Sequence, residues 1–312
     1  MELFLNKLSK DKLLHCMNTL GYIKQDQIID GTTIDDINTF WTISKKEKND
    51  SSNKLRESII NNILNGNIPE SWYTTKSDAS VKWVILRNEL NEFVKKINRS
   101  VPLKQVFIKA GRNYNYDFSF IFENNETKFI EFKYNVDSID KYPEIMSLSS
   151  NNFVKGIIYP EFFYDNYLTN FENLPSREFY LKNIHKNSVN HPFFINLKQQ
   201  DNLKPASEHS INIYLQEHLI FDFDKFKLRL QLQFDKIFML WKDGKMYMDK
   251  LTSEDIDIVH ELTLKSGKNG FNTVIIKSHS STVEYHLLLR WKNHIGVLYP
   301  AWQVKLVRKL EK

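Results

Sequence analysis

Alternating apolar and polar positions predict a β-hairpin near the middle of the chain. Residues 116–122 and 128–134 both alternate and are rich in aromatic and β-branched side chains, and the turn-forming pair Asn124-Asn125 separates them. Segments with this period and composition are typical of antiparallel strands. The short apolar run 105–108 predicts one more strand ahead of the hairpin.

Apolar residues at helical spacing predict helices on the N-terminal side of this hairpin. In residues 80–97 an apolar stripe indicates an amphipathic helix, for which Ser80 is the expected N-cap. The stripe consists of Leu86, Leu90, Phe93, Val94 and Ile97. Residues 3–20 and 54–64 show similar spacing, whereas the polar segment 44–53 predicts a surface loop or linker.

The C-terminal part combines several strand patterns. The pair Asp243-Gly244 lies between two apolar runs and is a strong hairpin signal. Alternation in residues 228–234 favours a strand, with a short helix as the alternative, and residues 144–150 favour a helix. Further antiparallel strands are expected at residues 273–276, 283–291 and 302–307.

These patterns predict an α+β protein with three parts. Residues 1–78 would form a mainly helical N-terminal region, and residues 79–205 would form a core around the hairpin. Residues 206–312 would form a β-rich C-terminal module. A chain of 312 residues is long enough for such an arrangement with a sizeable hydrophobic core.

Composition excludes some classes of protein and leaves the partner open. No stretch approaches the roughly 20 apolar residues of a membrane-spanning helix, and residues 1–12 lack the apolar segment of a secretion signal. We therefore expect an intracellular protein that is neither secreted nor bound to a membrane. Cys16 is the single cysteine, which excludes an internal disulfide and a multi-cysteine zinc site. A net charge of +5 permits a polyanionic partner without requiring one.

Three charged residues of the hairpin form the candidate site. Side chains two apart on a strand share a face, so the aromatic residues of 116–122 define one face and Asp117 points away from it. Glu131 and Lys133 likewise share the face opposite Ile130 and Phe132. If the strands pair, Asp117, Glu131 and Lys133 converge at one end of the hairpin.

Two carboxylates and a lysine in this arrangement suit metal-dependent phosphodiester hydrolysis. Carboxylate oxygens are the hard ligands that Mg²⁺ prefers, and two of them leave positions for water and phosphate. A neighbouring lysine can orient the attacking water and neutralise the phosphate. The alternative is an ordinary half-exposed sheet, on which Glu131 and Lys133 are a solvated pair.

The residues Tyr116-Asp117 followed by Glu131-Phe132-Lys133 resemble the PD-(D/E)XK nuclease superfamily, with Tyr116 in place of the proline of that motif. The resemblance implies a restriction-endonuclease-like fold, in which helices flank a mixed central sheet. It also implies that Asp117 and Glu131 bind the metal and that Lys133 is the catalytic lysine. The family commonly adds a glutamate from a preceding helix.

Helix 80–97 offers Glu89 and Glu92 for that position. Glu89 flanks the apolar stripe, whereas Glu92 lies further round the helix, so Glu89 is the favoured candidate.

Further basic residues are candidates for contacts with nucleic acid. Those flanking the expected cleft are Lys104, Lys109, Arg112 and Lys141. Arg290 and Lys292 alternate with Trp291 beside a turn, a composition that suits backbone contact with base stacking. The alternative for the first four is a solvated surface charge. The alternative for Arg290 and Lys292 is a hairpin whose tryptophan side chains pack into the core.

The resemblance implies a Mg²⁺-dependent endodeoxyribonuclease, with Mn²⁺ as a substitute, acting on double-stranded DNA in the manner of a type II restriction enzyme. Cutting both strands would call for a homodimer with one site per strand. Two alternatives remain at this point: a nucleic-acid-binding protein that has lost catalysis, and a ribonuclease that uses the same residues.

Overall fold

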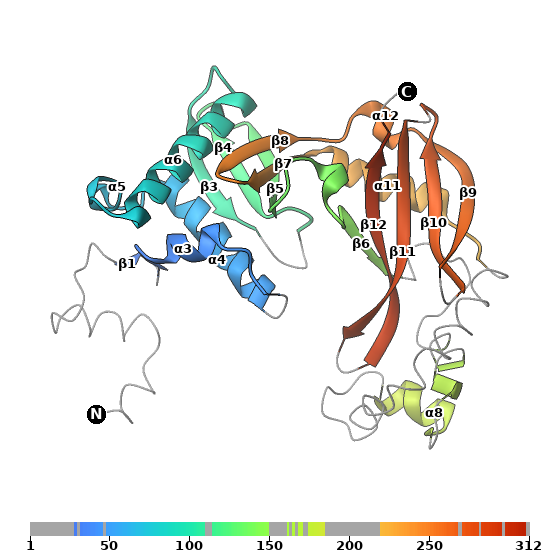
Figure 1. Cartoon of the computed structure of the whole chain (residues 1–312). Coiled ribbons are helices and arrows are strands. Elements are labelled where there is room, and N and C mark those ends of the chain that lie inside the picture. Colours follow the sequence, from blue (N-terminus) through green and yellow to red (C-terminus); the bar gives the residue numbers. More distant parts are fainter. Residues whose placement is uncertain are drawn as a thin grey trace, which may run out of the picture. The chain divides into compact units, whose positions relative to one another are not determined.

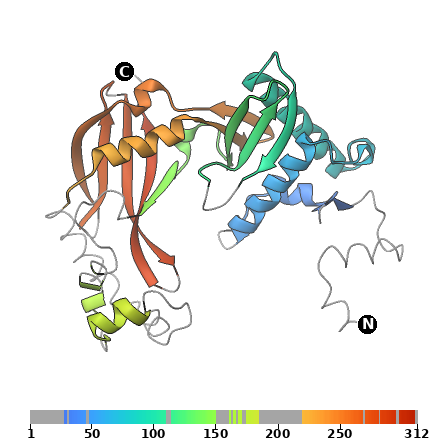
Figure 2. The ribbon, with the colours of Figure 1, turned by 180° about the vertical axis from the view of Figure 1, so that it is seen from behind.

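The computed structural model describes residues 28–29, 32–45, 48–109, 114–149, 161, 164–165, 168–170, 174–184, 219–267, 270–280, 282–294 and 297–309. The predicted helix at residues 3–20 lies outside them. The chain divides into two compact units, which Figures 1 and 2 show from opposite sides. Unit 1 comprises Met1–Ser138 and Asp235–Lys250, and unit 2 comprises Ile139–Phe234 and Leu251–Lys312. These units do not coincide with the predicted ranges 1–78, 79–205 and 206–312.

Unit 1 is a mixed five-stranded sheet covered by helices. Its strands are β3 (Leu103–Ile108), β4 (Phe118–Phe122), β5 (Thr127–Tyr134), β7 (Lys236–Lys242) and β8 (Lys245–Asp249), and this is also their order in the sheet. Strand β7 runs parallel to β5, and the other pairings are antiparallel. The helices are α3 (Asp36–Trp41), α4 (Asn49–Leu64), α5 (Glu70–Thr74) and α6 (Asp78–Ile97), and a short ladder joins β1 (Ile28–Ile29) to β2 (Thr32–Thr33).

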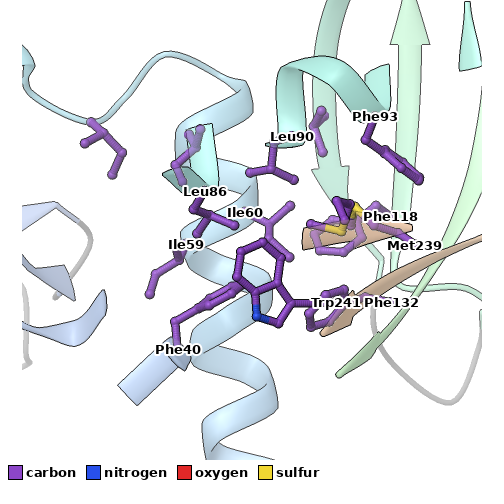
Figure 3. Packing of buried hydrophobic residues seen from close by; sticks show 14 of the residues in the cluster. Phe40, Ile59, Ile60, Leu86, Leu90, Phe93, Phe118, Phe132, Met239 and Trp241 are labelled. Carbon is purple, nitrogen blue, oxygen red and sulfur yellow. The ribbon is translucent and has the colours of Figure 1, made fainter. Parts of the chain in front are cut away.

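Aromatic and aliphatic side chains from the helices and one face of the sheet form the core of unit 1 (Figure 3). Trp241 on β7 lies at its centre, with its ring edge-on to Phe40 at 5.3 Å between centroids. The predicted stripe of α6 is confirmed, because Leu86, Leu90 and Phe93 are fully buried against this core. The fold class is therefore α+β, with a mixed sheet and flanking helices.

The helix boundaries of unit 1 differ from the sequence prediction at two N-termini. Helix α6 is capped by Ser77, whose hydroxyl accepts a hydrogen bond from the Ser80 N–H at 3.2 Å, so Ser80 lies inside the first turn. Helix α4 begins at Asn49, within the segment 44–53 that was expected to be a loop. Polar residues are compatible with the exposed first turn of a helix, and for this reason composition alone placed the start of α4 too late.

Unit 2 contains a second, antiparallel sheet. Its strands, in sheet order, are β6 (Met146–Ser149), β12 (Val297–Arg308), β11 (Val283–His294), β10 (Gly270–Ser278) and β9 (Ile258–Gly267). Helix α11 (Phe223–Phe234) crosses one face of this sheet (Figure 2), and the ring of Phe226 packs edge-on against Tyr285 at 5.6 Å. Shorter elements of the unit include η3 (Ile139–Lys141), α8 (Arg177–Phe179), η6 (Tyr180–Ile184) and α12 (Ser253–Ile256).

Two predicted elements of unit 2 are wrong. Residues 144–150 contain strand β6 instead of a helix, because Met146–Ser149 pairs with β12, which lies far away in the sequence. Residues 228–234 belong to helix α11 and not to the favoured strand. A short helix was the alternative prediction for this segment. Phe226 and Leu230 are one helical turn apart and are buried on one face of the helix, whereas Leu228 and Leu232 lie on the exposed face. Within the described part of the chain, no helix is both long and apolar enough to cross a membrane.

The outer edge of β3 is covered by the side chain of Asn65, the C-cap residue of α4. The Asn65 amide nitrogen donates to the Val106 carbonyl at 2.9 Å, and the Val106 N–H donates to the Asn65 Oδ1 at 2.9 Å. Asn65 thus takes the place of a further strand at an edge that otherwise presents unpaired backbone groups.

We expect Asn65→Ala to lower the free energy of unfolding by about 2 kcal/mol, because it leaves both backbone groups of Val106 without their partner. Urea unfolding of the parent and the variant measures this difference. Asn88→Ala, on the exposed face of α6, is the control and should not lower stability, because alanine is the better helix former there. Equal stability of Asn65→Ala and the control would contradict this role.

Candidate active site

Asp117 is held against the strand that carries Glu131. It lies directly before β4, and its N–H donates to the Ile130 carbonyl at 2.9 Å. Its Oδ2 accepts a hydrogen bond from the Phe132 N–H at 2.8 Å. Asp117 therefore binds the peptide groups on both sides of Glu131, and the two acids are neighbours across the β4–β5 hairpin. The predicted hairpin is confirmed, but its first strand begins at Phe118 and not at Tyr116.

Two lysines bind the carboxylate of Glu131. The Lys133 Nζ lies 2.6 Å from one oxygen, and the Lys236 Nζ lies 3.2 Å from the other. Lys236 also donates to the backbone carbonyl of Asn115. Lys236 reaches Glu131 because β7 runs parallel to β5 and places Lys236 beside Phe129, on the face that Glu131 shares.

The three side chains of this ion-paired group are poorly accessible to water. The exposed fractions are 13% for Glu131, 16% for Lys133 and 4% for Lys236. Charges removed from water require close partners. The pairing of Lys236 with Glu131 satisfies this requirement inside the sheet.

Burial and charge shift the pKa values of the two acids in opposite directions. Burial, reinforced by the negative charge of Glu131, raises the pKa of Asp117 to about 6. Burial also acts to raise the pKa of Glu131, but Lys133 and Lys236 outweigh it and hold that pKa below its ordinary value. Burial lowers the pKa of Lys236, and Glu131 opposes this effect. Glu131 is therefore the firmly ionised acid, and Asp117 is the one that a further cation would stabilise most.

Glu57 of α4 is a third acid of the site, and the sequence interpretation missed it. The side chain is buried, and burial together with the charges of Asp117 and Glu131 raises the pKa of Glu57 to about 7. The signal was present in the sequence, because Glu57 lies one turn before Ile60 and so flanks the apolar face of its helix. The same argument that favoured Glu89 on helix 80–97 applies to Glu57 on helix 54–64.

The structure does not bring Glu89 to this group. Its Oε2 accepts a hydrogen bond from the Met246 N–H in β8 at 2.8 Å. In the sheet, Met246 pairs with Trp241, which pairs with Tyr134 of β5. Tyr134 is three residues beyond Glu131, which is about 10 Å along β5. Met246 lies two strands away from β5, which is about 10 Å across the sheet. Glu89 thus binds the backbone of β8 and not the acidic group for which it was the favoured candidate.

The predicted basic residues are distributed between both units. In unit 1, Lys104 is exposed on β3, and the N–H of Lys109 donates to the Asp117 carbonyl at 2.7 Å. In unit 2, Lys141 is exposed in η3, and Arg290 and Lys292 lie on β11 where it pairs with β12. Arg112 lies outside the described residues. Lys109 is thus the predicted basic residue that the structure connects directly to the acids.

The acids suit a magnesium ion by their donor chemistry. Mg²⁺ is commonly bound through one or two carboxylates and keeps several waters or phosphate oxygens as its other ligands. Asp117 and Glu131 provide such a pair, and a bound cation would favour the ionised form of Asp117, whose pKa burial and then the charge of Glu131 raise. Among the described residues, no set of three or more His, Cys, Asp or Glu side chains forms a complete metal-binding group. A cation held by the carboxylates of Asp117 and Glu131 would take its other ligands from water or from phosphate oxygens.

The raised pKa of Glu57 predicts a pH dependence of stability. Between its ordinary pKa of 4.5 and the folded value of about 7, the folded protein holds a proton that the unfolded chain releases. The contribution of Glu57 to the free energy of unfolding is therefore most favourable below about pH 4.5 and decreases as the pH rises towards 7.

We expect Glu57→Gln to flatten this dependence and to stabilise the protein at pH 8 by on the order of 2 kcal/mol. Melting temperatures measured in EDTA across pH 4.5 to 8 test it. Glu92→Gln, at an exposed position of α6, should retain the slope of the parent. If the melting temperature of Glu57→Gln depends on pH as that of the parent does, the pKa of Glu57 is not raised by burial in the folded protein.

Comparison of the chain with protein-family models, curated proteins and solved structures finds no match.

Proposed function

We propose that this chain is a Mg²⁺-dependent phosphodiester hydrolase, an endodeoxyribonuclease, with its active site at Asp117, Glu131 and Lys133. The observation that carries the proposal is the way Asp117 binds both peptide groups flanking Glu131 while Lys133 binds the Glu131 carboxylate. Two acids and a lysine are thus brought together from residues that are separated along the chain. The mixed sheet with flanking helices agrees with the restriction-endonuclease-like fold that the resemblance implies.

Each residue has a distinct role in this proposal. Asp117 and Glu131 hold the Mg²⁺, or Mn²⁺ in its place, and Glu57 adds negative charge beside them. The bound cation supplies stabilisation of the charge that develops on the phosphate oxygens. Lys133 orients the attacking water and neutralises the phosphate, since its Nζ is held 2.6 Å from the Glu131 carboxylate.

The DNA would be bound by basic residues outside the acidic group. Lys109 is next to the site through its backbone bond to Asp117, and it directly follows β3, on which Lys104 lies. Lys141, Arg290 and Lys292 of unit 2 are proposed to contact a DNA backbone, which is a typical use of such side chains. A homodimer with one site per strand would cut a duplex, a step that depends on family analogy alone.

The second candidate function is nucleic-acid binding without catalysis. The observation that favours it is the double ion pair of Glu131, whose two oxygens are each bound by a lysine. A carboxylate satisfied in this way needs no metal for its stability. Such a protein would bind nucleic acid in EDTA and in Mg²⁺ alike, with an affinity that falls with salt.

Cleavage assays with the whole protein separate these candidates. Supercoiled plasmid DNA and a structured RNA are each incubated with the protein in Mg²⁺ and in EDTA. The proposal predicts nicked or linear plasmid in Mg²⁺ and none in EDTA. Cleavage of RNA alone would identify a ribonuclease, and binding of either nucleic acid without cleavage would favour the second candidate.

A further inference from the structure

A row of aromatic rings extends from the acidic pair to the surface of unit 1. The ring of Phe129 stacks on Tyr116 with 4.4 Å between centroids and an interplanar angle of 26°. The ring of Tyr114 follows at 5.6 Å from Tyr116. These three residues are called the aromatic row below. At its outer end, the Lys109 Nζ lies 5.5 Å from the centre of the Tyr114 ring.

The aromatic row is fixed to the candidate active site at several points. Phe129 precedes Glu131 by two residues on β5, so both side chains share a face and are about 7 Å apart. Tyr116 is directly followed by Asp117. Lys236 binds both the Glu131 carboxylate and the carbonyl of Asn115, which lies between Tyr114 and Tyr116. The rings and the acids therefore form one connected arrangement.

The outer ring of the row is open to solvent. Tyr114 is 47% exposed, whereas the aromatic residues on the other face of the hairpin, such as Phe118 and Phe120, are fully buried. Sequence alternation placed Tyr116 on that buried face, but its ring stacks on Phe129 instead, because regular pairing of β4 begins only at Phe118. An exposed ring beside a lysine suits a base that stacks and a phosphate that pairs with the charge.

We propose that the aromatic row stacks an unpaired base of a nucleic-acid strand, with the adjoining phosphate directed to Asp117 and Glu131. A ring can stack only on a base whose face is free, whereas inside a duplex both faces of each base are covered by neighbours. The segment that the aromatic row binds is therefore single-stranded or locally unpaired, which includes an unpaired segment within a duplex substrate. The direction of the phosphate depends on the proposed function, but the binding of the base does not.

Fluorescence anisotropy tests the binding of the base in EDTA, where cleavage is absent. The probes are a short fluorescein-labelled DNA strand of mixed sequence and its blunt duplex. Tyr114→Leu removes the ring and retains apolar volume, and Tyr114→Phe is the matched control that keeps the ring. We expect Tyr114→Leu to bind the single strand about tenfold more weakly than the parent, and Tyr114→Phe to bind it as the parent does. Affinity for the duplex should be the same for all three proteins.

The outcomes distinguish this inference from the proposed function. Unchanged single-strand affinity of Tyr114→Leu would overturn the inference, even if the parent cleaves nucleic acid in Mg²⁺. Equal weakening in Tyr114→Leu and Tyr114→Phe would also overturn it, because the hydroxyl and not the ring would then make the contact. The expected pattern in a parent that cleaves nothing would support the stacking site and remove the hydrolase proposal.

Discussion

Replacing Glu131 with glutamine is expected to lower Mg²⁺-dependent cleavage about a thousandfold. Glutamine keeps the length of the side chain and an oxygen that can accept from Lys133 or Lys236. It lacks the charge that would hold the cation and orient Lys133. Initial rates of plasmid nicking, measured at equal protein and Mg²⁺ concentrations, report the loss.

The control for this variant is Glu126→Gln, in the turn of the same hairpin. Glu126 pairs with Lys128 at 2.5 Å, and both side chains are well exposed, at 40% and 36%. An exposed pair of this kind contributes little, so Glu126→Gln should cleave at the rate of the parent. If Glu131→Gln and Glu126→Gln cleave equally fast, the acidic pair is not the active site.

Replacing Lys236 with methionine is expected to lower the free energy of unfolding by about 3 kcal/mol. Methionine has a similar length but cannot donate to Glu131 or to the Asn115 carbonyl, so it leaves a buried carboxylate with Lys133 as its remaining ion-pair partner from this group. Burial of the charged Lys236 is itself unfavourable, so replacing this charge with methionine offsets part of the cost. Urea unfolding in EDTA measures the difference.

Lys128→Met is the matched control for Lys236→Met. Lys128 is also paired with a glutamate, but its side chain is 36% exposed against 4% for Lys236. Its removal should hardly change stability. Equal stability of Lys236→Met and Lys128→Met would show that the buried ion pair does not hold β7 to β5.

Local sequence patterns were sufficient for the part of the site that lies on the hairpin. The alternation of residues 128–134 fixes which side chains share a face, and the turn between the strands brings Asp117 to Glu131. The same holds for the hairpin at Asp243-Gly244, where both residues have positive φ angles of 49° and 80°. These features depend on neighbours in sequence, which periodicity can detect.

The remaining members of the site depend on contacts between distant segments. Lys236 is 105 residues from Glu131 and reaches it through the parallel pairing of β7 with β5, which no local pattern specifies. Glu57 and Glu89 both flank apolar stripes, so the choice between them depends on where α4 and α6 lie on the sheet. That placement depends on the packing around Trp241, which helical periodicity does not predict.

The proposed metal site can be tested by measuring the binding of Mg²⁺ to the folded protein. Isothermal titration calorimetry compares the parent with Asp117→Asn, which keeps an oxygen acceptor for the Phe132 N–H but removes the negative charge. We expect saturable binding to the parent and at least tenfold weaker binding to the variant, because Asp117 is one of the two acids assigned to the cation. Identical titrations for the two proteins, or no binding to the parent, would contradict it.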